Sequence, residues 1–424
     1  MQFTSFMTVR HDLRLGNVGQ NRQSGEDRYR QGCYAIVAVA LAILAIALET
    51  PAFESGTQPA KQPVTEIAIA SSPCLVAGQY YVATSGSDSN EGSSCKPWAT
   101  IQHAAAVAGP GSTVHVNSGT YSAGTITTNA SGTADARITY VSDEKWGAKL
   151  QGVGANIVWA NHGDFVDIKG FEVTGDGVAT IGLLNYASNV RYLGNNVHAI
   201  PATGCPENGG AGIDNYGADA KYSDVIGNWI HDVGDCTKPC PRVHGIYQAT
   251  RGGHIWNNVV FRNQGWGIHL YGYATDIVVA NNTVFSNGYG GIVVAGGPTV
   301  IDDNTLVSNN LVYQNGLSKG ADGNGIEEFG SYVGSHNRYL NNSVSTNGPA
   351  DWNLRNKNAS ATLQSDPRFV NFRPDGTGDY HLLPSSPAVD AGTSEGAPGF
   401  DFDGNPRPSG LGYDIGAFEL QTKR

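Results

Sequence analysis

The sequence predicts a parallel β-helix, an all-β solenoid in which each turn of the chain stacks on the previous turn. An asparagine recurs at steps of 33, 30, 24, 28 and 32 residues, and a Gly-Ile pair recurs in phase with it. The markers are Asn195, Asn228, Asn258, Asn282, Asn310 and Asn342, with Gly212, Gly245, Gly267, Gly291 and Gly325. The short segments between them are rich in Val, Ile, Tyr and Phe, which is typical of β-strands. Two markers that recur together indicate stacked turns of one structure.

The composition fits one elongated domain. The chain has 424 residues, of which 56 are glycine and 15% are charged. Tight corners that recur every few residues favour glycine. We expect residues 79–365 to form an N-terminal cap and the β-helix, and residues 366–424 to finish or cap the helix. With 26 basic and 37 acidic residues the net charge is −11, which disfavours a nucleic-acid partner. A monomer is expected.

The residues before the repeat predict export. Residues 33–48 form an apolar run that follows five arginines; the run is short for a membrane span but suits the core of a signal peptide. We expect residues 1–48 to be a signal peptide or, if uncleaved, a signal anchor, and residues 49–78 to be a flexible linker. The protein is therefore expected to be secreted or otherwise extracytoplasmic, with a membrane contact only if the apolar run is retained.

The cysteines of an exported chain are expected to form disulfides. Cys74 and Cys95 bracket the start of the folded domain, and we expect them to pair. Cys205 is expected to pair with either Cys236 or Cys240 on the next coil, which leaves one thiol over. A metal site is disfavoured because no histidine lies at zinc spacing among them.

The N-terminal end has the pattern of a cap. Trp98 to Ala108 is an alanine-rich amphipathic stretch that ends at Gly109-Pro110-Gly111, and we expect a short helix that covers the open end of the solenoid. The segment YYVATSGSDSNEG…PWATIQHAAAVAGPGSTVHVNSGTY resembles the entry cap of secreted right-handed β-helix proteins of the pectate lyase superfamily. The tail DPRFVNFRPDGTGDYHLLPSSPAVDAGT…DFDGNPRPSGLGYDIGAFEL is similar to the exit segment of the same proteins. The resemblance spans roughly residues 79–420 and implies a right-handed helix, in a family that includes lyases, hydrolases, epimerases and adhesins.

The repeat register separates buried from exposed positions. We interpret the asparagine row as a structural ladder of side-chain amides. The isoleucine of each Gly-Ile pair should point inward, so the next residue, and the residue two further on, should point outward. These outward rows are Asp214, Tyr247, His269, Val293 and Glu327, and then Tyr216, Ala249, Tyr271, Ala295 and Phe329. Insertions at residues 201–211, 234–244 and 316–324 fall at one corner and should wall a groove beside this face.

The outward rows bring together residue types that suit acid–base chemistry on a glycan. The candidate catalytic residues are Tyr247, His269, Tyr271, Arg242 and His244, and the candidate substrate-binding residues are Asp214, Tyr216, Tyr273, Glu327 and Phe329. An arginine can neutralise a uronate carboxylate, while histidine and tyrosine can move the protons of β-elimination. The same set could perform C5 epimerisation. The leading hypothesis is therefore a polysaccharide lyase or C5-epimerase for a uronic-acid-containing glycan.

Two other functions stay open. A glycoside hydrolase needs two carboxylates roughly 5–10 Å apart, and Asp214 and Glu327 are too far apart in the register. A binding or adhesive module would use the aromatic row alone. The calcium-binding aspartates and basic residue of the familiar pectate lyase site are not matched, so we assign no metal ligand and expect no required cofactor. A structural or catalytic calcium ion is the alternative, and Asp88–Glu91 and Asp401–Asn405 are candidates that plain turns also explain.

Overall fold

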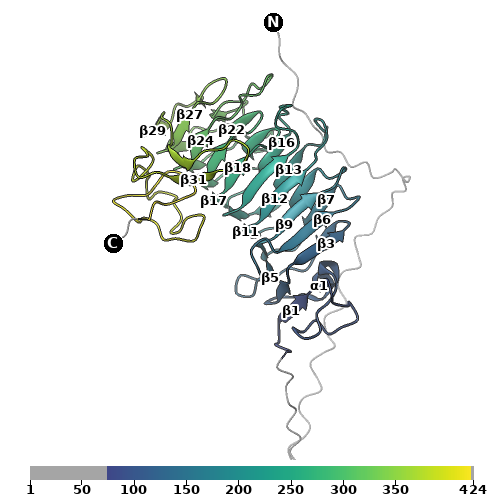
Figure 1. Cartoon of the computed structure of the whole chain (residues 1–424). Coiled ribbons are helices and arrows are strands. Elements are labelled where there is room, and N and C mark those ends of the chain that lie inside the picture. The colour runs from purple at the N-terminus through teal and green to yellow at the C-terminus, as the bar shows by residue number, and fades with distance from the viewer. Residues whose placement is uncertain (1–73, 422–424) are drawn as a thin grey trace, which may run out of the picture. The chain divides into compact units, whose positions relative to one another are not determined.

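The computed structural model describes residues 74–421, which form a right-handed parallel β-helix built from three long parallel sheets (Figure 1). The first sheet has 11 strands: β1 (Gln79–Val82), β2 (Thr113–Val116), β5 (Ile138–Ser142), β8 (Val166–Lys169), β11 (Arg191–Leu193), β14 (Asp224–Ile226), β17 (His254–Trp256), β20 (Val278–Ala280), β23 (Leu306–Ser308), β26 (Arg338–Leu340) and β29 (Ala359–Ser360). The second sheet has nine: β3 (Gly119–Ala123), β6 (Ala148–Gly152), β9 (Glu172–Gly175), β12 (Asn196–Ile200), β15 (Trp229–Val233), β18 (Val259–Phe261), β21 (Thr283–Phe285), β24 (Leu311–Tyr313) and β27 (Ser343–Ser345). The third sheet also has nine: β4 (Ile126–Thr128), β7 (Ile157–Asn161), β10 (Ile181–Asn185), β13 (Gly210–Lys221), β16 (Val243–Arg251), β19 (Trp266–Leu270), β22 (Gly290–Val294), β25 (Ile326–Glu328) and β28 (Trp352–Asn353).

The interior is a stack of aliphatic side chains, as the register predicts. The isoleucines of the Gly-Ile pairs are fully buried and belong to one core cluster: Ile213, Ile246, Ile268, Ile292 and Ile326. They pair with one another from strand to strand along the third sheet. The preceding glycines let neighbouring coils approach, because a Cβ at Gly212 would lie 2.6 Å from a side-chain carbon of Ile230. The Gly-Ile pair is therefore a packing requirement of this corner.

The predicted asparagine ladder is confirmed at the corner between the first and second sheets. Asn258 shows the pattern: its Nδ2 donates to Oδ1 of Asn282 (2.9 Å) and to the carbonyl of Val225 (2.8 Å). Its Oδ1 accepts from the backbone N–H (2.9 Å) and Nδ2 (3.0 Å) of Asn228. All six ladder asparagines are fully buried. Each coil thus hydrogen-bonds to the next through side chains as well as through strands.

A second amide ladder runs along the corner between the second and third sheets. It consists of Asn263, Asn287, Asn315 and Asn347, in which each Nδ2 donates to the next Oδ1 at 2.9–3.0 Å. The last amide donates to Asp351 (3.0 Å). The sequence already shows this ladder, since these asparagines lie five residues after those of the first ladder.

The predicted cap is α1 (Ile101–Val107), the one helix in residues 74–421. Thr100 caps its N-terminus by accepting from His103 N–H, and Ile101 and Ala104 are buried in the core of the solenoid. The side-chain amide of Gln102 accepts from the N–H of Thr127 (2.8 Å) and donates to its carbonyl (3.2 Å). Since Thr127 lies on the terminal strand β4, the helix satisfies an edge that has no further strand beside it. Helix α1 is too short to span a membrane, and no other helix occurs among the described residues; the apolar run 33–48 lies outside them.

The C-terminal residues pack along the outer face of the second sheet. A small antiparallel pair, β30 (Phe369–Asn371) and β31 (Asp379–Leu382), forms part of this segment. Phe369, Tyr380 and Phe418 join a core cluster with Phe261 and Phe285 of β18 and β21. The structure differs from the expectation that this segment finishes or caps the helix, because the segment packs on a side of the solenoid.

Among residues 74–421 two disulfides are present, Cys74–Cys95 and Cys205–Cys240. The first is the predicted pair, and the second is one of the two alternatives for Cys205. Cys236 is partly buried and forms no disulfide with another cysteine of the described residues.

Candidate active site

The outer face of the third sheet carries the predicted row. Asp214 pairs in register with Tyr247, Tyr247 with His269, and His269 with Val293, which in turn pairs with Glu327. The rings of Tyr247 and His269 lie 5.4 Å apart between centroids. The prediction that these two side chains are neighbours on one face is therefore confirmed.

Two histidines form the centre of this face. Nδ1 of His269 lies 3.1 Å from Nε2 of His244, so one hydrogen joins the two imidazoles. The ring of His244 also stacks on Tyr247, with centroids 5.3 Å apart. Nδ1 of His244 is buried and has no hydrogen-bond partner within residues 74–421. The cluster of His244, Tyr247 and His269, called the histidine cluster below, thus contains a polar atom that the protein leaves unpaired.

Burial sets the protonation of the histidine cluster. Both histidines are only 5% exposed. Burial lowers the pKa of His269 to about 3, and burial together with His269 holds the pKa of His244 well below its ordinary range. Burial, with the nearby Asp214, raises the pKa of Tyr247 well above 10. At neutral pH the three side chains are therefore uncharged. One imidazole nitrogen is free to accept a proton, because the other lone pair lies in the hydrogen bond between the two histidines, and one phenol can donate a proton.

Asp214 is a second polar side chain on this face with an unpaired buried atom, as judged from residues 74–421. Its Oδ1 is buried and finds no hydrogen-bond partner in the described part of the chain, and burial raises the pKa of Asp214 to about 7. Tyr186 and Tyr216 lie near it, with their rings edge to face at 6.3 Å. A carboxyl group in this setting is partly protonated at neutral pH, and it can donate a hydrogen bond as well as accept one.

An apolar bed borders the histidine cluster. Trp266, Val293 and Ala295 form a buried cluster on the outer face of the sheet, and Tyr271 and Tyr289 pack against it. Trp266 lies 6.4 Å from His269 between ring centroids, and Tyr271 lies 5.7 Å from it. The sequence reasoning missed Trp266 and Tyr289, although Trp266 immediately precedes the third Gly-Ile pair.

Three other candidates lie on this side of the molecule but have different surroundings. Glu327 is buried and accepts from the backbone N–H of Asn324 (3.2 Å), while burial raises its pKa. Phe329 is 46% exposed. Tyr273 follows β19 in a turn and lies near enough to Tyr216 to affect its pKa, which burial raises. These residues flank the histidine cluster.

Arg242 lies in the insertion before β16 and contacts the insertion before β13. Its Nη2 lies 3.5 Å from the carbonyl oxygen of Cys205, in the loop before β13. Its Nε is buried without a partner. Among residues 74–421, no hydrogen bond or ion pair joins Arg242 to the histidine cluster. No direct contact therefore supports the predicted role of Arg242 in neutralising a substrate carboxylate.

The insertions occur where the sequence places them. Residues 201–209 separate β12 from β13, 234–242 separate β15 from β16, and 314–325 separate β24 from β25. The corresponding turns before β19 and β22 contain only residues 262–265 and 286–289. The disulfide Cys205–Cys240 ties the first two insertions together. The groove that these loops would wall remains a prediction.

The residues of this face fit a calcium ion poorly. Calcium takes six to eight oxygen ligands, mostly carboxylates and carbonyls, and the neighbours of Asp214 are tyrosines. Across the described part of the chain, no group of three or more His, Cys, Asp or Glu side chains is placed to share a metal. The two acidic turns use their carboxylates otherwise: Asp88 accepts from Thr100 N–H (2.9 Å), and Asp401 from Asn405 N–H (2.7 Å).

Comparison with known proteins agrees with the architecture. Residues 154–347 match the family described as "Right handed beta helix region", and residues 84–130 match a family of unknown function, DUF1565. Pectate lyase L of Dickeya chrysanthemi is 26% identical over 413 residues, covering 80% of this chain and 90% of the relative. Pectate lyase L of Dickeya dadantii (strain 3937) is 27% identical over 408 residues, with the same coverage. The crystal structure of pectate lyase Pel9A superposes with a TM-score of 0.57 at 20% identity, covering 80% of this chain and 96% of that one. These findings identify the chain as a right-handed parallel β-helix that is similar to pectate lyases.

Proposed function

We propose that this protein is a polysaccharide lyase that cleaves a uronic-acid-containing glycan by β-elimination on the outer face of the third sheet. The observation that carries the proposal is the uncharged histidine cluster, in which His244, Tyr247 and His269 are in mutual contact on neighbouring coils. The relatives named pectate lyase L support the substrate class, because pectate is a polymer of uronic acid.

His269 is the proposed base. In the elimination, the C5–H bond breaks and His269 takes the proton, the C4–C5 double bond forms, and the bond from C4 to the glycosidic oxygen breaks. This role requires the tautomer in which Nδ1 of His269 donates to Nε2 of His244, because Nε2 of His269 then keeps its lone pair. A bound uronate would raise the low pKa of His269, since a nearby negative charge favours the imidazolium. The base would therefore gain strength when substrate binds.

Tyr247 is the proposed acid. Its pKa is raised by burial and by Asp214, so the phenol keeps its proton at neutral pH. It lies beside His269 in the same row, and it could deliver this proton to the leaving oxygen. Tyr271, which directly follows β19, lies 5.7 Å from His269 between ring centroids and would contribute a stacking surface or a second proton path.

The substrate carboxylate requires a partner that stabilises the charge developing at C5. Asp214 in its protonated form could donate a hydrogen bond to that carboxylate, and its unpaired Oδ1 indicates that the folded protein has not used this group. Arg242 could serve if the wall loop moves it away from Cys205. Tyr216, Tyr273, Glu327 and Phe329 would line the path of the chain on either side.

The geometry supports a hydrolase less well. Asp214 and Glu327 are separated by four register steps. At about 4.8 Å per step this distance is roughly 19 Å, whereas paired catalytic carboxylates lie roughly 5–10 Å apart.

The proposed setting is outside the cytoplasm. The two disulfides favour an oxidising compartment. We further propose that the protein acts as a monomer and is secreted by cleavage of residues 1–48.

The test is an incubation of the purified protein with a panel of uronic-acid polysaccharides. Elimination creates a conjugated double bond, so ultraviolet absorbance should rise, and His269→Ala should abolish the rise. Solvent hydrogen entering C5 without a rise in absorbance would indicate an epimerase. New reducing ends without absorbance would indicate a hydrolase. None of these products, with retained binding, would indicate a carbohydrate-binding protein.

A further inference from the structure

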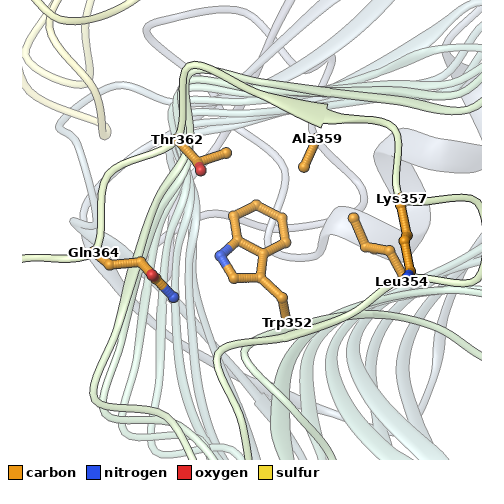
Figure 2. A pocket seen from close by; sticks show the side chains of 6 residues that line it. All are labelled: Trp352, Leu354, Lys357, Ala359, Thr362 and Gln364. Carbon is orange, nitrogen blue, oxygen red and sulfur yellow. The ribbon is translucent and has the colours of Figure 1, made fainter.

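The C-terminal end of the solenoid carries a cavity separate from the histidine cluster. Its volume is about 330 Å³, and it is lined by Trp352, Leu354, Lys357, Ala359, Thr362 and Gln364. Figure 2 shows the indole of Trp352 in the middle of this coil, with Thr362 and Gln364 on one side of it and Leu354 and Lys357 on the other. The lining therefore combines one aromatic ring with polar and cationic groups.

The cavity exists because the last coil has no coil above it. Strands β28 and β29 are terminal in their sheets, each with one strand beside it. Trp352 continues the inward isoleucine row, since it pairs in register with Ile326, and it packs against the core together with Leu354. The N-terminal end has α1 in this position, whereas residues 366–421 lie along the second sheet. One side of the indole thus closes the core while it also lines the cavity.

The polar side chains that line the cavity lie outside the hydrophobic core. Lys357 and Gln364 are exposed and Thr362 is half-buried. No carboxylate lines the cavity. Within residues 74–421, Lys357 has no ion pair, although acidic residues outnumber basic ones in the chain by 37 to 26. A lysine without an ion pair, in a lining that also contains an aromatic ring, points to an anionic ligand that also has an apolar face.

We propose that this end cavity is a second carbohydrate-binding site, which takes a uronic acid residue of a glycan chain. The C–H face of the sugar would lie on the indole of Trp352, its carboxylate would pair with Lys357, and its hydroxyl groups would bond to Thr362 and Gln364. A neutral sugar would leave the ammonium group unused. An apolar peptide would desolvate three polar groups without pairing them.

The position of the end cavity gives it a use. From His269 on β19 to Trp352 on β28 there are three strand steps in the third sheet. At about 4.8 Å per step the separation along the axis is roughly 14 Å, a distance that one glycan chain can bridge. A chain held at the end cavity would raise the local concentration of its neighbouring residues at the histidine cluster. The choice of a uronic acid as ligand rests on the proposed function.

The experiment uses isothermal titration calorimetry of the full chain carrying His269→Ala, so that substrate is not consumed. The probe is trigalacturonate, and its methyl ester is the neutral counterpart. We expect Lys357→Ala to weaken one binding event by about three- to tenfold, as loss of a typical hydrogen bond does. Gln364→Ala should have a smaller effect. Both residues are exposed, so both variants should fold, and Lys169→Ala removes an exposed lysine from the first sheet as the matched control.

The outcomes separate this proposal from the proposed function. Binding that Lys357→Ala leaves unchanged, or an ester that binds as well as the acid, would overturn the end cavity as a uronate site, whatever the catalytic activity. If trigalacturonate binding depends on Lys357 but the wild-type protein has no lyase activity, the end cavity stands as a uronate site and the proposed lyase activity is refuted. A concentration-dependent dimer whose contact buries Trp352, and which trigalacturonate does not dissociate, would identify the ligand as a second copy of the chain and overturn the proposal.

Discussion

Two rows of side chains run along this solenoid at the same spacing, and they differ in how their polar atoms are paired. The asparagine ladder repeats one residue type, and each Nδ2 donates to the next Oδ1 at 2.8–3.1 Å. The outer row of the third sheet changes residue type at every coil, and Oδ1 of Asp214 and Nδ1 of the adjacent His244 are buried without partners. A buried polar atom without a partner costs free energy in the folded protein. The ladder therefore serves the fold, whereas the outer row has groups left for a ligand.

The largest expected effect is that of His269→Ala, which removes a side chain from the outer row of the third sheet. Loss of the proposed base should lower kcat by about a hundredfold to ten-thousandfold, because that is the usual contribution of a general base. The unfolding free energy should fall as well, by about 1–3 kcal/mol, because the variant leaves Nε2 of the buried His244 without its partner. Initial rates of absorbance increase and a denaturant titration measure the two effects.

His198→Ala is the matched control for this variant. His198 also stacks on a histidine of the neighbouring coil, His231, with centroids 4.9 Å apart, but on the second sheet. It should leave kcat unchanged. Equal losses of kcat in both variants would mean that the activity depends on the integrity of the whole solenoid and not on the histidine cluster.

The opposite effect is expected in the ladder. Asn258→Ala removes the partner of two buried groups of Asn228 and leaves the carbonyl of Val225 without its donor. At about 1–3 kcal/mol for each unsatisfied group, the unfolding free energy should fall by at least about 3 kcal/mol. The kcat of the folded fraction should stay the same. Urea unfolding followed by circular dichroism gives the first quantity.

The end of the ladder provides the comparison. Asn342 accepts from Asn310 and donates to the carbonyl of Val307, but no further ladder amide lies beyond it. Asn342→Ala leaves three corresponding groups without partners, but Asn258→Ala also takes the Nδ2 donor from Oδ1 of Asn282, so Asn342→Ala should destabilise the protein slightly less. An equal or larger loss would contradict the view that the ladder acts as a cooperative stack.

The sequence predicts the features that depend on the period. The coil register places Tyr247 beside His269, and this follows from counting residues back to Ile246 and Ile268. The second ladder was equally visible, because Asn263 follows Asn258 at a fixed distance, but its meaning depends on knowing that the corner is buried.

Features that depend on loop conformation could not be predicted. Arg242 lies close to His244 in sequence, yet the wall loop directs its guanidinium toward Cys205, tied by the second disulfide to the same loop. The position of residues 366–421 likewise depends on how a segment without the repeat folds, so it could not be predicted. Phe369 and Phe418 could have covered any apolar surface, and the outward aromatic stack of Phe261 and Phe285 offers one on the second sheet.

Asp302 tests whether an unpaired buried oxygen alone marks a functional group. This side chain lies in a turn after the third sheet, where it is fully buried; Oδ1 accepts from Thr305 (2.7 Å) and Oδ2 has no partner. Burial raises the pKa of Asp302 from 3.8 to about 8. The folded protein therefore holds a proton that the unfolded chain has lost in this interval, so stability falls as pH rises from 3.8 to about 8.

Asp302→Asn should remove this dependence. The difference in unfolding free energy between variant and wild type should grow in favour of the variant by up to about 1.4 kcal/mol per pH unit across the interval. Chemical denaturation at several pH values measures it, and kcat should not change at any of them. A flat difference would show that Asp302 titrates normally, and a loss of activity would place a functional group outside the third sheet.

The smallest expected effect concerns Asp214. At neutral pH, Asp214→Asn should change kcat/KM by about threefold or less, because the amide can still donate a hydrogen bond to the substrate. The pH profile should change more. Burial raises the pKa of Asp214 to about 7, so the wild-type protein should lose its donor, and part of its kcat/KM, as pH rises through this value. The variant should keep its kcat/KM over the same range, because an amide does not titrate. Parallel profiles would assign the decline to another group, and a large loss at every pH would mean that Asp214 acts as a carboxylate, so the unpaired oxygen would be an acceptor for a substrate hydroxyl.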